Sequence, residues 1–319
     1  MSHRFLSQIS KLSLSGFLFA GLLTLTLSSN ATDQSLIRVT DFLGNITELP
    51  KPAKRIIALA PHIVENVYSA GAGKQLVGVV NYSNFPEETS GLPIVGGYQS
   101  INLEAIISLQ PDLILGWESG NKPQVFEKIR QLGIPLYIDQ PHSLEDVARA
   151  IKDIGQLSGN KQYSIKAAKT YLQRLKQLRQ RYQDQEILSV FYQVWNKPLY
   201  TLNDKHIISD IIRLCGGHNI YADEAILSPV ISLESLLQRD PQVIIASGMG
   251  EQRPQWLEDW RQWPSLQAVK QDTLYFVPPD LIQRHTMRIL QGTEMLCEHL
   301  ATAREKYPLN TIDAKQQHR

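Results

Sequence analysis

The sequence predicts an α/β protein of two lobes, each with a central parallel sheet, joined by one long α-helix. Three observations predict this arrangement. The segment INLEAIISLQPDLILG at 101–116 has a close copy, ISLESLLQRDPQVIIA, at 231–246. Short apolar runs alternate with amphipathic helical patterns in both halves of the chain. Between the halves, residues 161–185 contain neither glycine nor proline.

Each copy of the repeated segment reads as a helix followed by a strand. Asn102 and Ser232 are favourable helix N-caps, and Pro111 and Pro241 end the two helices. The runs LILG and VIIA that follow are typical of buried parallel strands. Two copies of one half-unit indicate two lobes of one design. The residues expected on the buried faces of the two helices are Leu103, Ile106, Ile107, Leu233, Leu236 and Leu237.

The second helical position of each copy is a glutamate, Glu104 in the first and Glu234 in the second. An acid at this position complements the helix dipole, which is worth about 0.3–1 kcal/mol. The alternative is a matched pair of docking charges, one per lobe, for a partner with two basic pockets. The spacing leaves both interpretations open.

Composition is that of an ordinary globular protein. With 319 residues, 43% hydrophobic residues and a formal net charge of +1, the chain is long enough for two medium-sized lobes. It lacks the basic excess that nucleic acid binding requires, so no nucleic acid partner is expected.

Residues 1–31 have the pattern of a signal peptide. Arg4 and Lys11 precede the apolar run LSLSGFLFAGLLTLTLS, and Ser-Asn-Ala at 29–31 is a small-x-small cleavage site. A membrane anchor is the alternative, but the apolar run is short and interrupted by serines. No cysteine directly follows the run, so a lipid anchor is not expected. We expect cleavage near Ala31 and an exported, soluble protein.

Export bears on the two cysteines, Cys215 and Cys297. In an oxidising compartment one disulfide is the simple outcome, and two buried free thiols are the alternative. One pair of cysteines cannot hold an iron-sulfur cluster or a four-thiolate zinc site.

The first lobe, expected at 32–158, alternates strands and helices. IRVTDFLGNITEL at 37–49 indicates a hairpin, and 62–70 has a helical pattern. Buried strands are expected at 55–60, 75–80, 113–115 and 135–138.

The interlobe helix is expected within residues 159–186. At 1.5 Å per residue it spans roughly 35 Å, and one rigid helix between lobes limits hinge motion. Its apolar stripe consists of Ala168, Tyr171, Leu172, Leu175, Leu178 and Tyr182.

The second lobe is expected at 187–308, followed by a polar tail at 309–319. Strands are predicted at 187–194, 243–246 and 274–277. Helices are predicted at 207–214, 233–237, 265–270 and 286–301.

Common enzyme motifs are missing from the sequence. The Gly-Ala-Gly at 71–73 follows a helical pattern, so it reads as a helix C-cap rather than a dinucleotide loop. There is no G-x-S-x-G, H-E-x-x-H or P-loop motif. His62, His206, His218 and His285 show no metal-ligand spacing, and each is expected to be a surface or loop residue. We predict no catalytic residue, no metal site and no resident cofactor.

Aromatic residues gather beyond the expected strand ends. Tyr82 and Phe85 follow one strand, Trp117 follows another, and Tyr98 precedes the first repeated helix. Ligands bind beyond the carboxyl ends of strands in open α/β sheets. Each aromatic alone can belong to a satellite core, but the three at strand ends favour a flat apolar ligand. Two further aromatics, for which core packing is the simpler role, are Trp195 and Tyr200.

Asp280 and Arg284 follow the last expected strand and are four residues apart. They can pair along a helical turn. They can equally offer one acceptor and several donors to a ligand with amide groups.

Five segments, taken in order, carry a resemblance to a known family. They are RIIALAP at 55–61, VGVVNYSNFP at 77–86, VGGYQSINLEAIISLQPDLILGWESGN at 95–121, LCGGHNIY at 214–221 and PDLIQRHTMR at 279–288. Over about residues 36–305 the chain resembles the substrate-binding proteins of ABC importers whose two Rossmann-like lobes are joined by one helix (class III). It is most similar to the members that bind cobalamin (vitamin B12).

The resemblance implies a periplasmic protein that captures cobalamin in its interlobe cleft without making or breaking a bond. It implies docking of Glu104 and Glu234 on arginines of the membrane permease, which works with ATPase subunits. The cysteines match a family disulfide in the second lobe, and the protein is expected to be a monomer. The ligand contacts implied are Tyr82, Tyr98, Trp117, Asp280 and Arg284.

Two positions depart from the family pattern. Tyr98 stands where a tryptophan is expected, and Ser228 occupies a position where a tryptophan packs on the ligand. The smaller ring surface leaves open which corrinoid is preferred. The alternative ligands within the class are haem and ferric siderophores, which call for several cleft arginines, whereas only Arg284 and Arg288 are candidates. A metal-dependent periplasmic enzyme is the alternative outside it, with His62 and His285 as the candidate ligands.

Overall fold

The structure, a computed structural model, describes residues 36–97, 100–248 and 252–307. The predicted signal peptide at 1–31, Tyr98 and the predicted polar tail at 309–319 lie outside the described residues. Within the described ranges, no helix combines the length and the apolar character needed to cross a membrane.

The first lobe contains a four-stranded parallel sheet in the order β4-β3-β5-β6. The two central strands are apolar on both faces: all of β3 and the first four residues of β5 are buried. An antiparallel hairpin, β1 with β2, precedes the sheet. The strands are β1 (Ile37–Thr40), β2 (Ile46–Leu49), β3 (Ile56–Ala58), β4 (Leu76–Gly78), β5 (Leu113–Trp117) and β6 (Leu136–Asp139).

Helices connect these strands, and the longest of them, α4, is capped at both ends. The Ser143 hydroxyl accepts from the Asp146 amide, the Asp146 carboxylate accepts from the Ser143 amide, and Gly159 ends the helix at a φ of 79°. The helices of this lobe are α1 (Pro61–Ser69), α2 (Leu103–Ser108), α3 (Pro123–Gln131) and α4 (Leu144–Ser158), with short 3₁₀ turns η1 (Gly73–Gln75) and η2 (Glu87–Thr89).

The second lobe repeats the design with a parallel sheet in the order β10-β7-β11-β12. All four residues of β11 are buried between β7 and β12. The strands are β7 (Leu188–Gln193), β10 (Gly217–Asn219), β11 (Val243–Ala246) and β12 (Leu274–Phe276), with a small hairpin of β8 (Trp195–Asn196) and β9 (Leu199–Tyr200). The helices are α6 (Ile207–Leu214), α7 (Leu233–Arg239), η3 (Gln255–Gln262), α8 (Gln267–Lys270), α9 (Pro279–Ile282) and α10 (Ile289–Lys306).

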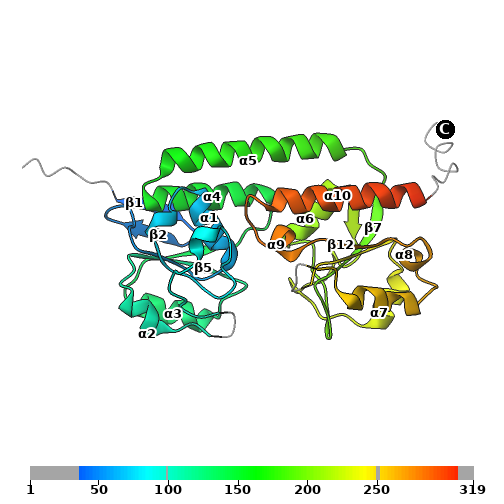
Figure 1. The fold of residues 1–319 in the computed structure, drawn as a ribbon, viewed down its shortest axis with the longest axis horizontal. Coiled ribbons are helices and arrows are strands. Elements are labelled where there is room, and N and C mark those ends of the chain that lie inside the picture. Colours follow the sequence, from blue (N-terminus) through cyan, green and yellow to red (C-terminus); the bar gives the residue numbers. More distant parts are fainter. Residues whose placement is uncertain (1–35, 98–99, 249–251, 308–319) are drawn as a thin grey trace, which may run out of the picture. The chain divides into compact units, whose positions relative to one another are not determined.

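Helix α5 (Lys161–Tyr182) connects the lobes and contacts both of them. On the first-lobe side the Tyr171 hydroxyl donates to the Leu144 carbonyl of α4 at 2.9 Å. On the second-lobe side Arg174 pairs with Glu294 of α10 at 3.1 Å. In Figure 1, α5 runs alongside α4 and α10.

The predicted fold class is confirmed: two lobes, each with a parallel sheet, are joined by one long helix. The predicted lobe boundaries, 32–158 and 187–308 with 159–186 between them, stay predictions. One residue of the repeated helices differs from expectation. Ile107 is 49% exposed, whereas Ile106 and Leu236 are fully buried. Helix α2 is only six residues long, so a single turn of it faces the core.

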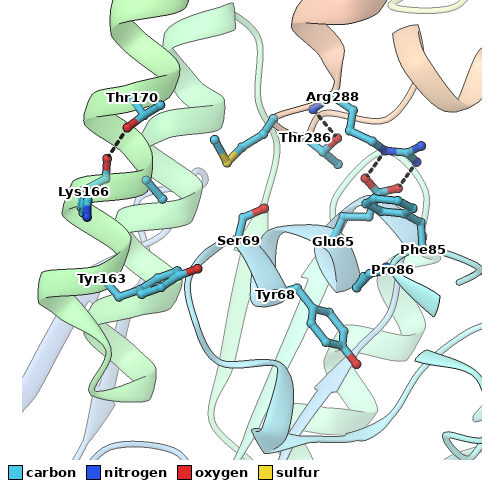
Figure 2. Close-up of a pocket in the computed structure, with 12 residues that line it drawn as sticks. Glu65, Tyr68, Ser69, Phe85, Pro86, Tyr163, Lys166, Thr170, Thr286 and Arg288 are labelled. Carbon is cyan, nitrogen blue, oxygen red and sulfur yellow. Dashed lines mark hydrogen bonds and ion pairs between the residues drawn. The ribbon is translucent and has the colours of Figure 1, made fainter. Parts of the chain in front are cut away.

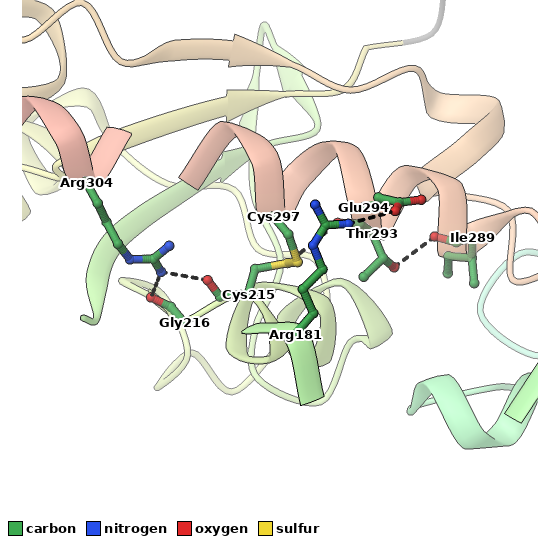
Figure 3. The surroundings of a disulfide bond; sticks show 8 residues. All are labelled: Arg181, Cys215, Gly216, Ile289, Thr293, Glu294, Cys297 and Arg304. Atoms are coloured by element: carbon green, nitrogen blue, oxygen red, sulfur yellow. Dashed lines mark hydrogen bonds and ion pairs between the residues drawn. A yellow bond between two sulfur atoms is a disulfide. The ribbon is translucent and has the colours of Figure 1, made fainter. Parts of the chain in front are cut away.

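The predicted disulfide is confirmed, and it joins Cys215 at the end of α6 to Cys297 in the middle of α10 (Figure 3). Both half-cystines are fully buried. Close by, the Arg304 guanidinium donates to the carbonyls of Cys215 and Gly216 at 2.7 and 2.8 Å. The end of α6 is therefore held to α10 by the disulfide and by two hydrogen bonds from the Arg304 guanidinium.

Replacing both cysteines by alanine is expected to lower the free energy of unfolding by roughly 2–5 kcal/mol, because the bond closes a loop of 82 residues in the unfolded chain. Chemical denaturation of the wild type and of the Cys215→Ala/Cys297→Ala variant measures the difference. Adding reductant to the wild type is the control and is expected to give the same loss. Equal denaturation midpoints for the wild type and the variant would contradict a stabilising role.

Candidate functional site

Trp117 ends strand β5 and lines a cavity of about 310 Å³, the Trp117 cavity. Trp117 and Ser119 come from the first lobe, and the other lining residues come from the second. The indole N–H of Trp117 is buried without a hydrogen-bond partner in the described structure, which is uncommon for a buried donor. The apolar lining from the second lobe is Val194, Leu202, Ile208 and Leu227.

A group of histidines surrounds Trp117. The His62 ring lies edge-on to the indole at 5.0 Å, and His285 lies 5.1 Å from His62 and 5.7 Å from His206 between ring centroids. His62 also hydrogen-bonds Asp139 at 3.1 Å. His62 is buried on helix α1, so its predicted surface or loop placement was wrong, whereas His285 is buried but lies in a loop. Helix α1 and the segment before α10 meet at this point, which covers both rings.

Burial decides the protonation of this group. It lowers the pKa of His62 and of His206 to about 3 and that of His285 well below its usual value. It raises the pKa of the Asp139 carboxyl to about 8. Near neutral pH the imidazoles are therefore uncharged and Asp139 is protonated. Within the described ranges, no three His, Cys, Asp or Glu side chains are arranged to hold a metal ion.

Arg284 makes two ion pairs and one hydrogen bond. It pairs with Asp280 at 2.9 Å along the helical turn, which is one of the two alternatives that the spacing left open. It also pairs with Glu65 of α1 at 2.9 Å and donates to the Tyr82 carbonyl at 3.2 Å. Glu65 in turn binds Arg288 at 2.7 Å. We call Glu65, Asp280, Arg284 and Arg288 the Glu65 cluster; it joins the two lobes.

The aromatics predicted at strand ends line separate hollows. Tyr82 is 83% exposed at a φ of 65° and lines a hollow of about 440 Å³ in the first lobe. Phe85 lies against the guanidinium of Arg288, 3.9 Å from its ring centroid, and lines a third hollow of about 510 Å³ beside α5 (Figure 2). Of these three aromatic residues, Trp117 alone lines the Trp117 cavity.

Of the second-lobe residues that the sequence singled out, His206, Ser228 and His285 line the Trp117 cavity. Trp195 and Tyr200 face each other across the β8–β9 hairpin and do not line it. A serine at position 228 leaves room in the cavity wall that a larger ring would fill.

Glu104 and Glu234 occupy equivalent places in the two lobes. Each is exposed at the second position of its helix, behind the N-caps Asn102 and Ser232. Hydrogen bonds from the helix start and from Ser232 lower the pKa of Glu234. Both glutamates are therefore exposed on the surface of their lobes.

Sequence reasoning missed Glu65 and Asn66. Both are buried on α1, and the Asn66 amide donates to the His285 carbonyl at 2.9 Å across the lobes. A signal was present: the segment HIVENV places an acid and an amide between Val64 and Val67, which are fully buried. Polar groups on a buried helix face need partners elsewhere in the fold.

The buried histidines predict loss of stability in acid. Their folded-state pKa values lie below 6.5, so below that pH the unfolded chain binds more protons and stability falls. The raised pKa of Asp139 has the opposite effect, because this carboxyl holds a proton in the folded state that the unfolded chain has lost. It therefore cancels the loss of stability caused by about one of the histidines. We expect a loss of roughly 1–3 kcal/mol per pH unit below 6.5.

Denaturation midpoints measured between pH 7 and pH 5 test this expectation. The His285→Leu variant is expected to lose stability less steeply than the wild type, by about 1.4 kcal/mol per pH unit. His218→Leu, at an exposed position of β10, serves as the control and keeps the wild-type slope. A wild-type slope in His285→Leu would mean that His285 does not contribute.

Comparison with known proteins agrees with this architecture. A family model described as periplasmic binding protein matches residues 56–281. The chain is 39% identical over 258 residues to the vitamin B12-binding protein of Vibrio cholerae serotype O1, covering 81% of this chain and 92% of that protein.

Solved structures give the same result. The crystal structure of the periplasmic vitamin B12 binding protein BtuF of Vibrio cholerae matches with a TM-score of 0.74 and 38% identity, over 80% of this chain and 99% of that one. The periplasmic heme-binding protein RhuT from Roseiflexus sp. RS-1 has the same fold, with a TM-score of 0.69 at 23% identity over 79% of this chain and 99% of that one. By sequence and by fold, the chain belongs to the periplasmic binding protein family.

Proposed function

We propose that this protein binds cobalamin in the interlobe cleft in the periplasm and delivers it to the permease of an ABC importer. The observation that carries the proposal is Trp117, an indole with an unpaired buried N–H at the end of β5, in a cavity with mostly apolar walls from both lobes. The similarity to vitamin B12-binding proteins supports the same ligand. No chemical step is part of this function.

The charge of the cleft favours a neutral, amide-rimmed ligand over a carboxylate-bearing one. Arg284 and Arg288 are both paired with Glu65. The neighbouring histidines are uncharged near pH 7 because burial lowers their pKa values. Haem and ferric siderophores with carboxylates would meet no unpaired cation from these residues.

A corrinoid is larger than the 310 Å³ Trp117 cavity, so the proposal requires this cavity to widen around Trp117 when it binds. The ligand would extend from Trp117 toward Tyr82, and Asp280 and Arg284 would meet its amide edge. Tyr98, outside the described residues, is the fifth proposed contact. Most of the binding free energy would come from apolar contact, at roughly 25 cal/mol per Å² of apolar area covered, less the cost of ordering.

The first test is calorimetric titration of the mature protein with cyanocobalamin, with haemin and a ferric siderophore as comparison ligands. Saturable one-to-one binding of cyanocobalamin alone is expected. Trp117→Ala should weaken binding at least tenfold, since covering roughly 60–100 Å² of ring is worth about 1.5–2.5 kcal/mol. Trp263→Ala, a half-buried tryptophan that packs on Trp260 outside the cavity, is the matched control. No retained cyanocobalamin would refute the proposed ligand.

We further propose that Glu104 and Glu234 dock the loaded protein on basic pockets of the permease, one per lobe. Replacing both by alanine is expected to leave the cyanocobalamin Kd unchanged and to abolish uptake into vesicles that carry the permease and its ATPase subunits. The double variant Glu127→Ala/Glu305→Ala removes one exposed helical acid from each lobe and should transport normally. Normal uptake by the Glu104/Glu234 variant would contradict docking through these residues.

A further inference from the structure

Glu65 is a buried carboxylate held between two guanidinium groups. Its side chain is 3% exposed, and it lies on α1 of the first lobe. One oxygen accepts from Arg284 at 2.9 Å and from Arg288 at 2.7 Å, and the other accepts from Arg288 at 2.9 Å. Figure 2 shows the paired contact with Arg288 beside Phe85.

The two arginines are largely enclosed, although less so than the acid that binds them. The side chains of Arg284 and Arg288 are 12% and 20% exposed. Arg284 is also held by Asp280 at 2.9 Å, and Arg288 is covered by the ring of Phe85. With two acids and two arginines, the formal charges of the Glu65 cluster cancel.

This balance matters because Arg284 and Asp280 are proposed to face the ligand. A buried guanidinium without a partner attracts anions strongly, since little water screens its charge. Glu65 removes that attraction from both arginines and fixes the direction in which Arg284 presents its remaining donors.

We infer that Glu65 is a positioning residue that sets the charge selectivity of the cleft, neutralising Arg284 and Arg288 so that an amide-rimmed corrinoid is preferred to a carboxylate-bearing ligand. This inference rests on the proposed cobalamin function. It assigns to the first lobe a residue that acts on the ligand through two arginines of the second lobe.

Two corrinoids of the same ring test it: cyanocobalamin, and dicyanocobyrinic acid, in which carboxylates replace the side-chain amides. Glu65→Gln leaves a cluster charge of +1, so its affinity for cyanocobalamin is expected to fall while its affinity for the acid rises. The affinity ratio should shift at least tenfold toward the acid. Arg288→Gln leaves a charge of −1 and should shift the ratio the opposite way. If Glu65→Gln does not fold, the Arg288→Gln variant alone still tests the inference.

The matched control is Glu145→Gln, which breaks one exposed ion pair, with Arg179 at 2.9 Å, and should leave both affinities unchanged. If Glu65 had a purely structural role, Glu65→Gln would weaken the binding of both corrinoids by the same factor. That result would overturn this inference and leave the proposed function standing. Equal ratios in the wild type, Glu65→Gln and Arg288→Gln would overturn it as well. Failure of the wild type to bind cyanocobalamin would refute the proposed function itself.

Discussion

The contact of helix α5 with both lobes is the constraint on which the rest of the structure depends. Two parallel sheets each present the carboxyl ends of their strands at one edge, where loops carry the residues proposed to face the ligand. Helix α5 brings together loops from segments as distant as β5 and the start of α10. The hydrogen bond of Tyr171 to α4 attaches this helix to the first lobe, and the pairing of Arg174 with Glu294 attaches it to the second. The disulfide at Cys297 then holds α10 within its own lobe.

Neutrality is the second organising feature of the site. Burial keeps the histidines beside Trp117 uncharged near neutral pH, and it raises the pKa of Asp139 so that this carboxyl is protonated there. The Glu65 cluster is charged but balanced. Such a cleft is suited to selection by shape and apolar contact, with hydrogen bonds for orientation, as in most small-molecule sites.

Three glutamates illustrate how surroundings decide the role of one residue type. Glu104 and Glu234 begin short helices and are exposed, so a partner from outside the chain can reach them. Glu65 lies on a buried helix face and finds its partners in the other lobe. The exposed pair is expected to act between molecules, whereas Glu65 acts within this one.

The sequence alone determined the α/β class, the two copies of one half-unit and the long interlobe helix, because these depend on local periodicity and spacing. It favoured the disulfide from the presence of two cysteines in an exported chain, and the structure shows it. It also indicated Trp117 and the pairing of Asp280 with Arg284, which are near in sequence to a strand end or to each other. Only the tertiary structure decided that His62 meets His285 and that Glu65 meets Arg284, since those pairs are over 200 residues apart in the chain. Contacts across two lobes have no local pattern, so packing alone brings them together.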